Sequence, residues 1–243
     1  MNDKINVDII GDSHVRKYFS DEFLSTDTES RETTLNKLQS EFFFNTCSMR
    51  GATMYSINNP NSKTKANYWY SKFLKKTKQN RSNYFGIHIG EIDCNYTSWI
   101  LAHKKNKKVK EIIDTSVQNL KQFILENVTK FYINKQIIII CPTLPSIHDS
   151  NKYFNKNGLV RPFYDIQVPD IKMRTELTLY LNAKLKILSD DIGSKFIDIS
   201  NLIINNETQL IDEKYTFGRN VDNHLPFLSI YNLWLGKFRD LVK

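Results

Sequence analysis

The sequence is poor in cysteine and has no long apolar run. Its three cysteines are widely spaced, without a Cys-x-x-Cys pair or a Cys/His cluster, so they indicate neither a disulfide framework nor a zinc site. No window approaches the roughly 18 consecutive apolar residues of a membrane-spanning helix, and the N-terminus leads directly into a short apolar segment rather than a secretory signal. We therefore expect a cytoplasmic protein with no integral membrane segment, no metal and no cofactor.

Signatures of nucleic-acid binding are also missing. The formal net charge of +8 would attract phosphate backbones, anionic lipids or acidic polysaccharides equally well. However, no RNP-like aromatic strand, zinc finger or helix-turn-helix pattern accompanies the lysines. The densest basic stretches, 72–78 and 103–110, are therefore interpreted as solvated surface, and a nucleic-acid partner is the least favoured alternative.

Short apolar runs alternate with helical patterns along the chain, which is typical of βα units and a parallel sheet. The runs expected to form strands are 5–10, 41–47, 84–89, 136–141 and 195–199. The patterns expected to form helices are 14–23, 66–78, 110–131, 170–191 and 227–242. Residues 137–141 of the fourth run are all apolar, which predicts a strand in the middle of the sheet that is covered on both faces.

These patterns predict one α/β domain spanning residues 1–243, a three-layer α/β/α sandwich with a five-stranded parallel sheet. With 243 residues, of which 40% are hydrophobic, the chain can bury a full core. The stretch 146–168 mixes aromatic, Asn and Lys residues without a regular period, so we expect a substrate-covering loop there.

Polar and glycine-containing motifs follow each of the first four predicted strands. They are Gly11-Asp12-Ser13, Arg50-Gly51-Ala52, Gly90-Glu91-Ile92-Asp93 and Pro142-Thr143-Leu144-Pro145. Ligands of such sheets bind outside the carboxyl ends of the strands, so all four motifs stand where a site is expected.

Ser13 lies where the first strand turns into a helix. A serine hydroxyl becomes a nucleophile only with a general base in reach and N–H donors for the oxyanion that forms on attack. Its own N–H at the start of a helix is one such donor. The alternative is that Asp12 or Ser13 simply caps the helix, since both residue types are favoured there.

The order of the motifs resembles that of the SGNH, or GDSL-type, hydrolases: a GDS block, a glycine after the second strand, Gly-x-x-Asp after the third, and a late Asp/His pair. The resemblance implies a flavodoxin-like topology. It also implies that Ser13 is the nucleophile, that the N–H groups of Ser13 and Gly51 bind the oxyanion, and that His224 is the base.

Two positions depart from the family pattern. The third block of the family places an asparagine where this chain has Ile92, and the side chain of Asn95 is the nearest amide that can complete the oxyanion hole. The family places an acid where this chain has Val221, so Asp222 is the acid predicted to orient His224, with a main-chain carbonyl as the alternative.

Other polar residues near the motifs are candidate substrate contacts. They are His148 and Arg161 in the predicted loop, and Glu91 and Asp93 just after the third predicted strand. Glu91 and Asp93 could instead hydrogen-bond the Ser13 loop or satisfy exposed backbone N–H groups, and the structural role is favoured for each. The five histidines show no ligand spacing for a metal.

The function predicted from these residues is acyl transfer through a Ser13 acyl-enzyme. Water as acceptor makes the chain an esterase, and a sugar hydroxyl makes it an O-acyltransferase. A carbohydrate O-acetyl group is the expected substrate, because the third block looks like that of glycan-associated relatives and the predicted loop is polar and aromatic. The alternative from another class is a catalytically decayed SGNH-like module that binds glycans.

Overall fold

The computed structural model describes residues 4–19, 41–77, 82–147, 169–217 and 224–242. Within them the chain forms a five-stranded sheet whose neighbouring strands are all parallel, in the order β2-β1-β3-β4-β5. The strands are β1 (Ile5–Gly11), β2 (Phe42–Ser48), β3 (Tyr84–His88), β4 (Ile137–Ile140) and β5 (Lys195–Ile197). This is the flavodoxin-like strand order, and it confirms the predicted fold class.

Helices connect the strands, as βα units require. The α-helices are α1 (Ser13–Phe19), α3 (Ala66–Thr77), α4 (Ser98–Lys105), α5 (Val109–Phe123), α7 (Ile171–Ile192), α8 (Ser200–Ile203) and α9 (Phe227–Val242). Two π-helical turns, Asp93–Thr97 and Ile124–Val128, and two 3-10 turns, Asn134–Gln136 and Glu213–Tyr215, complete the regular structure of the described residues.

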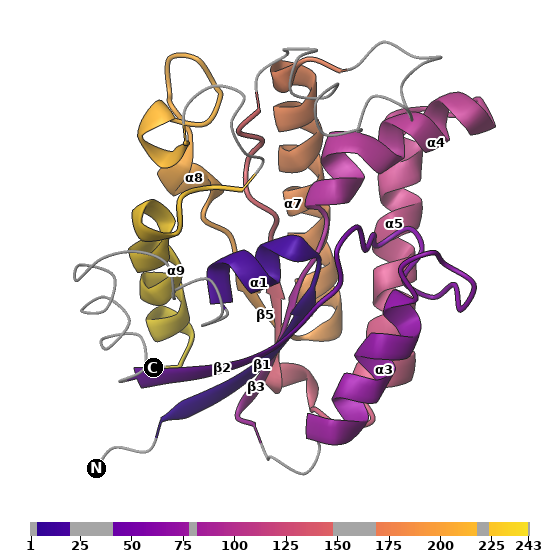
Figure 1. The fold of residues 1–243 in the computed structure, drawn as a ribbon, viewed down its shortest axis with the longest axis vertical. Coiled ribbons are helices and arrows are strands. Elements are labelled where there is room, and N and C mark those ends of the chain that lie inside the picture. The colour runs from indigo at the N-terminus through magenta and orange to yellow at the C-terminus, as the bar shows by residue number, and fades with distance from the viewer. Residues whose placement is uncertain (1–3, 20–40, 78–81, 148–168, 218–223, 243) are drawn as a thin grey trace.

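The helices cover both faces of the sheet, with α8 and α9 on one side of it and α3 and α5 on the other (Figure 1). Side chains of β4 alternate between two cores, because successive residues of a strand point to opposite faces. Ile137 and Ile139 pack with α3, α5 and α7, whereas Ile138 and Ile140 pack with α1, α8 and α9. The prediction of a three-layer sandwich is therefore confirmed. Strand β4 is covered on both faces as expected, but β3 is the middle strand of the five, and β4 lies between β3 and the edge strand β5.

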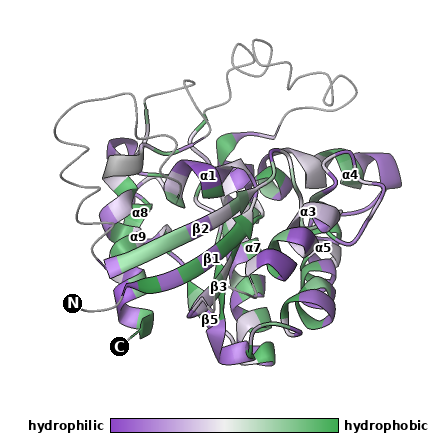
Figure 2. Ribbon diagram, turned by 60° about the horizontal axis from the view of Figure 1, so that its bottom comes forward, coloured by the Kyte–Doolittle hydropathy of each residue, from purple (hydrophilic) through white to green (hydrophobic). Residues whose placement is uncertain are grey.

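The hydropathy of the elements matches this arrangement. Figure 2 shows β1 and β2 as largely hydrophobic ribbons, while the covering helices carry both hydrophobic and hydrophilic residues. Among the described helices, none combines the length and the apolar content needed to cross a bilayer.

The strand order reverses between β1 and β3, and this is where the carboxyl ends of the central strands meet. In the parallel register, Gly11 of β1 pairs with His88 of β3, which in turn pairs with Ile140 of β4. The chain segments after these three strands therefore leave the sheet at the same edge. They carry Asp12 and Ser13, Glu91, and Thr143 respectively.

Most predicted elements agree with the observed ones to within one or two residues, and three larger differences concern helices. The helix predicted over 110–131 is regular only to Phe123 and continues as a π-helical turn. Helix α4 was not predicted, because only Ser98 and Ala102 of its eight residues are buried and its sequence lacks a clear apolar stripe. Helix α1 is described up to Phe19, and the rest of the helix predicted over 14–23 lies outside the described residues.

The close approach of β1 and β3 requires glycine at position 11. A Cβ atom there would lie 1.8 Å from the carbonyl oxygen of His88. We expect Gly11→Ala to lower the free energy of unfolding by about 3 kcal/mol, the upper part of the usual range for overpacking.

Urea denaturation measures this change, with Gly236→Ala as the control. A Cβ at Gly236, inside α9, meets no atom within 4 Å, so that variant is expected to be more stable by about 0.5–1 kcal/mol. A Gly11→Ala protein as stable as the wild type would contradict the close approach.

Candidate active site at the carboxyl edge of the sheet

The turn after β1 is held by side chains from two neighbouring elements. The hydroxyl of Tyr70 on α3 donates to the backbone carbonyl oxygen of Gly11 at 2.7 Å. The hydroxyl of Ser48, at the end of β2, donates to the backbone carbonyl oxygen of Asp12, also at 2.7 Å. Helix α1 begins directly afterwards at Ser13. These contacts fix the Ser13 backbone at the edge of the sheet.

Ser13 and His224, which are 211 positions apart in the sequence, meet at this edge. The Oγ of Ser13 lies 3.2 Å from the Nε2 of His224, within the reach that a general base needs. The next residue, Leu225, donates its backbone N–H to the hydroxyl of Tyr18 at 3.1 Å. Because Tyr18 lies on α1, the helix that carries Ser13 also holds the segment that carries His224.

His14 is buried between two carboxylates. Its Nδ1 lies 2.9 Å from Oδ1 of Asp12, which also accepts the His14 backbone N–H at 3.0 Å, and its Nε2 forms an ion pair with Oε2 of Glu91. The side chains of His14, Asp12 and Glu91 are 0%, 1% and 3% exposed. With an anionic oxygen at each ring nitrogen, the site suits an imidazolium cation.

The charges of this cluster shift the pKa values of His14 and Asp12. Burial alone would lower the pKa of His14, but the carboxylates of Glu91 and Asp12 outweigh it and raise this pKa to about 10. Burial raises the pKa of Asp12, but the neighbouring His14 more than offsets this, so the pKa of Asp12 is below its usual value. The two shifts together describe an ion pair that persists at neutral pH.

Glu91 links this cluster to the segment after β4. Its Oε1 accepts hydrogen bonds from the backbone N–H of Thr143 at 3.2 Å and from the Thr143 hydroxyl at 2.5 Å. One carboxylate oxygen thus faces Thr143 and the other faces His14. These contacts and its burial favour a structural role for Glu91 over the predicted substrate contact.

Asp93 supports the loop after β2. Its carboxylate accepts the backbone N–H groups of Met54 at 2.9 Å and Tyr55 at 3.2 Å, and burial raises its pKa to about 7 although these hydrogen bonds oppose the shift. The side chain is fully buried. For Asp93, too, the contacts favour the structural alternative over substrate binding.

The two other predicted oxyanion donors follow the strands on either side of β1. Gly51 lies in the turn after β2 with a φ of 76°, in the left-handed region that favours glycine. Asn95 is buried in the π-helical turn after β3, and its Oδ1 accepts a hydrogen bond from Nη1 of Arg174 at 3.3 Å. The donor roles of both residues stay predictions.

Arg174 of α7 is a buried polar residue that sequence reasoning missed. Besides Asn95, its guanidinium donates to the carbonyl oxygens of Pro169 at 3.1 Å and Ile147 at 2.6 Å. These two carbonyls flank the segment 148–168. An arginine within the buried stripe of α7 was the sequence signal that could have identified it.

Three predicted site residues lie outside the described residues. They are Asp222, expected to orient His224, and His148 and Arg161, expected to contact substrate. Most of the predicted loop 146–168 lies outside them as well. Within the described part of the chain, no three His, Cys, Asp or Glu side chains are grouped as a metal site requires.

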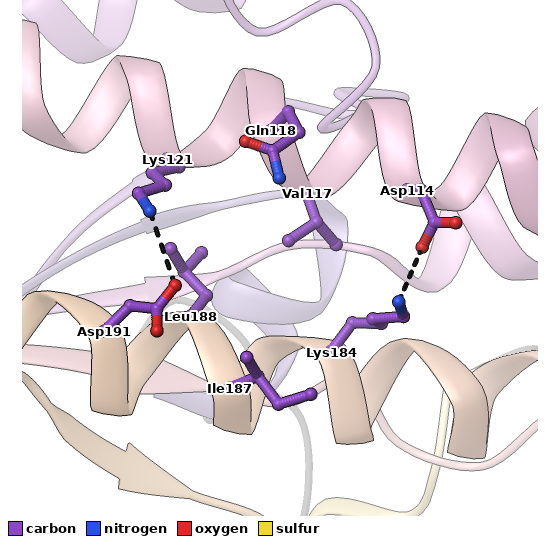
Figure 3. Close-up of a pocket in the computed structure, with 8 residues that line it drawn as sticks. All are labelled: Asp114, Val117, Gln118, Lys121, Lys184, Ile187, Leu188 and Asp191. Atoms are coloured by element: carbon purple, nitrogen blue, oxygen red, sulfur yellow. Dashed lines mark hydrogen bonds and ion pairs between the residues drawn. The ribbon is translucent and has the colours of Figure 1, made fainter.

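A cavity of about 180 Å³ lies away from this edge, between α5 and α7 (Figure 3). Ion pairs join its two walls, Lys121 with Asp191 at 3.4 Å and Lys184 with Asp114 at 3.2 Å. Its lining is Asp114, Val117, Gln118, Lys121, Lys184, Ile187, Leu188 and Asp191. None of these residues belongs to the four sequence motifs, so the cavity is separate from the candidate site.

The buried His14 ion pair predicts how stability depends on pH. The pKa of His14 is raised in the folded state to about 10 from an ordinary value of 6.5, so its contribution is complete below pH 6.5 and is lost as pH rises toward 10. We expect this contribution to fall by about 1.4 kcal/mol for each pH unit between pH 6.5 and 10, which is measurable from pH 7.5 upward.

Denaturant unfolding at several pH values tests this expectation, with His14→Gln as the reference. Tyrosines and cysteines that ionise on unfolding contribute equally to both proteins, so the difference between the two curves isolates His14. A difference that is constant from pH 7.5 to 10 would contradict an imidazolium at this position.

No protein-family model matches the sequence, and no curated protein matches it. Solved structures do match its fold. An acetylxylan esterase from Geobacillus stearothermophilus aligns with 98% of this chain and 93% of its own at a TM-score of 0.52 and 15% identity. Catalytic mutants of that esterase, in which a serine, an aspartate or a histidine is replaced by alanine, match in the same way.

Two further structures extend this likeness. A GDSL-like lipase from Bacteroides thetaiotaomicron aligns with 97% of this chain and 86% of its own at a TM-score of 0.52 and 14% identity. An α/β hydrolase from the metagenome of Lake Arreo, Spain, aligns with 97% and 95% at a TM-score of 0.56 and 11% identity. The chain therefore has the fold of the GDSL-type hydrolases, as the order of its sequence motifs predicted.

Proposed function

We propose that this chain is a divergent GDSL-type, serine-dependent acyl-ester hydrolase in which Ser13 is the nucleophile and His224 its general base. The main support is the 3.2 Å contact between Ser13 Oγ and His224 Nε2. It occurs at the carboxyl edge of a doubly wound sheet, where such folds bind ligands. The fold is shared with esterases and a GDSL-like lipase, which agrees with this chemistry.

In the first half of the reaction, His224 Nε2 accepts the proton of the Ser13 hydroxyl while Oγ attacks the acyl carbonyl carbon. The carbonyl oxygen becomes an oxyanion, for which the N–H groups of Ser13 and Gly51 and the amide of Asn95 are the candidate donors. The bond between the acyl carbon and the alcohol oxygen then breaks. The alcohol leaves with the proton held by His224, and the acyl group stays on Ser13.

In the second half, His224 accepts a proton from water as the water attacks the acyl-enzyme. The bond between the acyl carbon and Ser13 Oγ breaks, Oγ recovers the proton from His224, and the carboxylic acid leaves. A sugar hydroxyl in place of water transfers the acyl group to the sugar instead. The same residues therefore serve either an esterase or an O-acyltransferase, and the acceptor decides between them.

The substrate we propose is an O-acetyl group, or a similar short acyl group, on a carbohydrate. The support is the likeness of the third motif to that of glycan-associated relatives and the acetylxylan esterase among the structures that share the fold. Asp222 is the proposed acid behind His224, and His148 and Arg161 are the proposed substrate contacts.

The nucleophile is tested with p-nitrophenyl acetate and a fluorophosphonate probe. Ser13→Ala is expected to abolish labelling, and both Ser13→Ala and His224→Gln are expected to lower kcat/KM by at least about 10³-fold, as removal of a member of such a dyad does. Ser62→Ala, a serine in the loop after β2, is the control and should keep full activity. A folded wild-type protein that is neither labelled nor active would favour the decayed glycan-binding module.

The acyl group and the acceptor are tested with acetylated xylo-oligosaccharides. Release of free acetate that depends on Ser13 identifies an esterase. Acetate that appears on an added unacetylated oligosaccharide, detected by mass spectrometry, identifies a transferase. Hydrolysis of p-nitrophenyl acetate without action on any acetylated saccharide would contradict the carbohydrate substrate and leave the nucleophile assignment intact.

A further inference from the structure

Building on the proposed function, we propose that His14 is a positioning residue for the reaction: clamped between Asp12 and Glu91, its ring holds the His224 ring in line with Ser13. The inference concerns a residue to which the sequence motifs give no role. It rests on the contacts of the His14 ring and on a hydrogen bond between Tyr18, on the same helix, and the backbone N–H of Leu225 beside His224.

The first observation is a direct contact between the two histidine rings. Their centroids lie 4.3 Å apart, with the ring planes inclined by 39°. The His14 ring is held at both nitrogens, by Asp12 and by Glu91, so it cannot rotate without breaking one of the two ion pairs. The His14 ring is therefore fixed in place, and the His224 ring packs against it. This packing sets the direction in which Nε2 of His224 points.

The second observation is that the helix that carries His14 also holds the backbone beside His224. Tyr18, one turn after His14 on α1, accepts the backbone N–H of Leu225 at its hydroxyl, at 3.1 Å. Helix α1 thus contacts both the ring of His224, through His14, and the backbone that follows it, through Tyr18.

The contacts of His14 leave neither of its ring nitrogens as an acceptor for the Ser13 proton. An imidazolium has two N–H donors and no acceptor, and both donors already face carboxylate oxygens. The clamp therefore leaves His224 as the base, while His14 acts only through its position.

The activity test compares His14→Gln, Tyr18→Phe and the matched control Tyr132→Phe with the wild type. Tyr132 is a buried tyrosine whose hydroxyl bonds Asp8 inside β1, outside this network. With p-nitrophenyl acetate, we expect His14→Gln to lower kcat by about 10- to 100-fold, a part of the 10²–10⁴-fold that a positioned general base supplies. KM should change less than about threefold, because the base acts in the transition state.

Tyr18→Phe tests the backbone support beside His224. It removes the hydroxyl that accepts the Leu225 N–H, so we expect kcat to fall about fivefold, the effect of one neutral hydrogen bond. Tyr132→Phe should keep the wild-type kcat. A folded His14→Gln with wild-type kcat overturns the inference, and if that variant does not fold, a folded Glu91→Gln with wild-type kcat does so, because Glu91 is the partner of one ring nitrogen of His14.

A spectroscopic measurement separates positioning from packing. Histidine ring ¹⁵N NMR at pH 8 should show both nitrogens of His14 protonated, and the His224 ring resonances should shift and broaden in Glu91→Gln. Unprotonated His14 at pH 8, or unchanged His224 resonances, would contradict the clamp.

The outcomes also distinguish this inference from the proposed function. A wild-type protein that neither hydrolyses the ester nor reacts with the fluorophosphonate overturns both. A wild type that is active through Ser13, together with a folded and fully active His14→Gln, overturns the positioning role alone.

Discussion

A charged imidazole loses its hydration when it is buried, and only anionic partners with good geometry offset that loss. His14 obtains these partners from two different strands, since Asp12 follows β1 and Glu91 follows β3. The parallel register of the two strands, with Gly11 beside His88, puts both carboxylates within reach of one ring. Ser13 directly follows Asp12, the segment after β4 is attached to this cluster through Glu91, and the ring of His224 contacts the ring of His14.

The polar side chains of the third motif contact segments that follow different strands. Glu91 faces His14 and the segment after β4, whereas Asp93 holds the loop after β2 that begins with the second motif. Asn95, four residues after Glu91, is oriented by the hydrogen bond from Arg174. Ile92, between the two acids, replaces the asparagine of the family pattern. The acids of this motif thus hold the segments after β2 and β4 in place, although one position of the motif differs from the family pattern.

The fold was predictable because its signals are local. Five apolar runs separated by helical patterns define the strands, and the fourth run, which is apolar throughout 137–141, forms an interior strand between β3 and β5. Helix α4 escaped prediction because few of its residues are buried. The π-helical turn Asp93–Thr97 escaped because a change from an α-helical to a π-helical hydrogen-bond pattern leaves no trace in hydrophobic periodicity.

The candidate site was predictable only in part. The proximity of Ser13 and His224 followed from the order of motifs, which fixes the edge of the sheet at which each residue lies. The pairing of His14 with Glu91 did not follow, because it depends on the register between β1 and β3, and neither residue has a spacing that points to the other. A structural role was favoured for Glu91 and Asp93, but their partners, Thr143 and the backbone of Met54 and Tyr55, did not follow because they too depend on how neighbouring strands are placed.

The guanidinium of Arg174 binds the carbonyls of both Ile147 and Pro169, and so ties the two ends of the intervening segment to one point on α7. Once the two ends of a segment are held, loop closure costs only about 0.6 kcal/mol for each doubling of loop length. A single buried side chain thus sets where the described segment after β4 ends and where the segment that enters α7 begins.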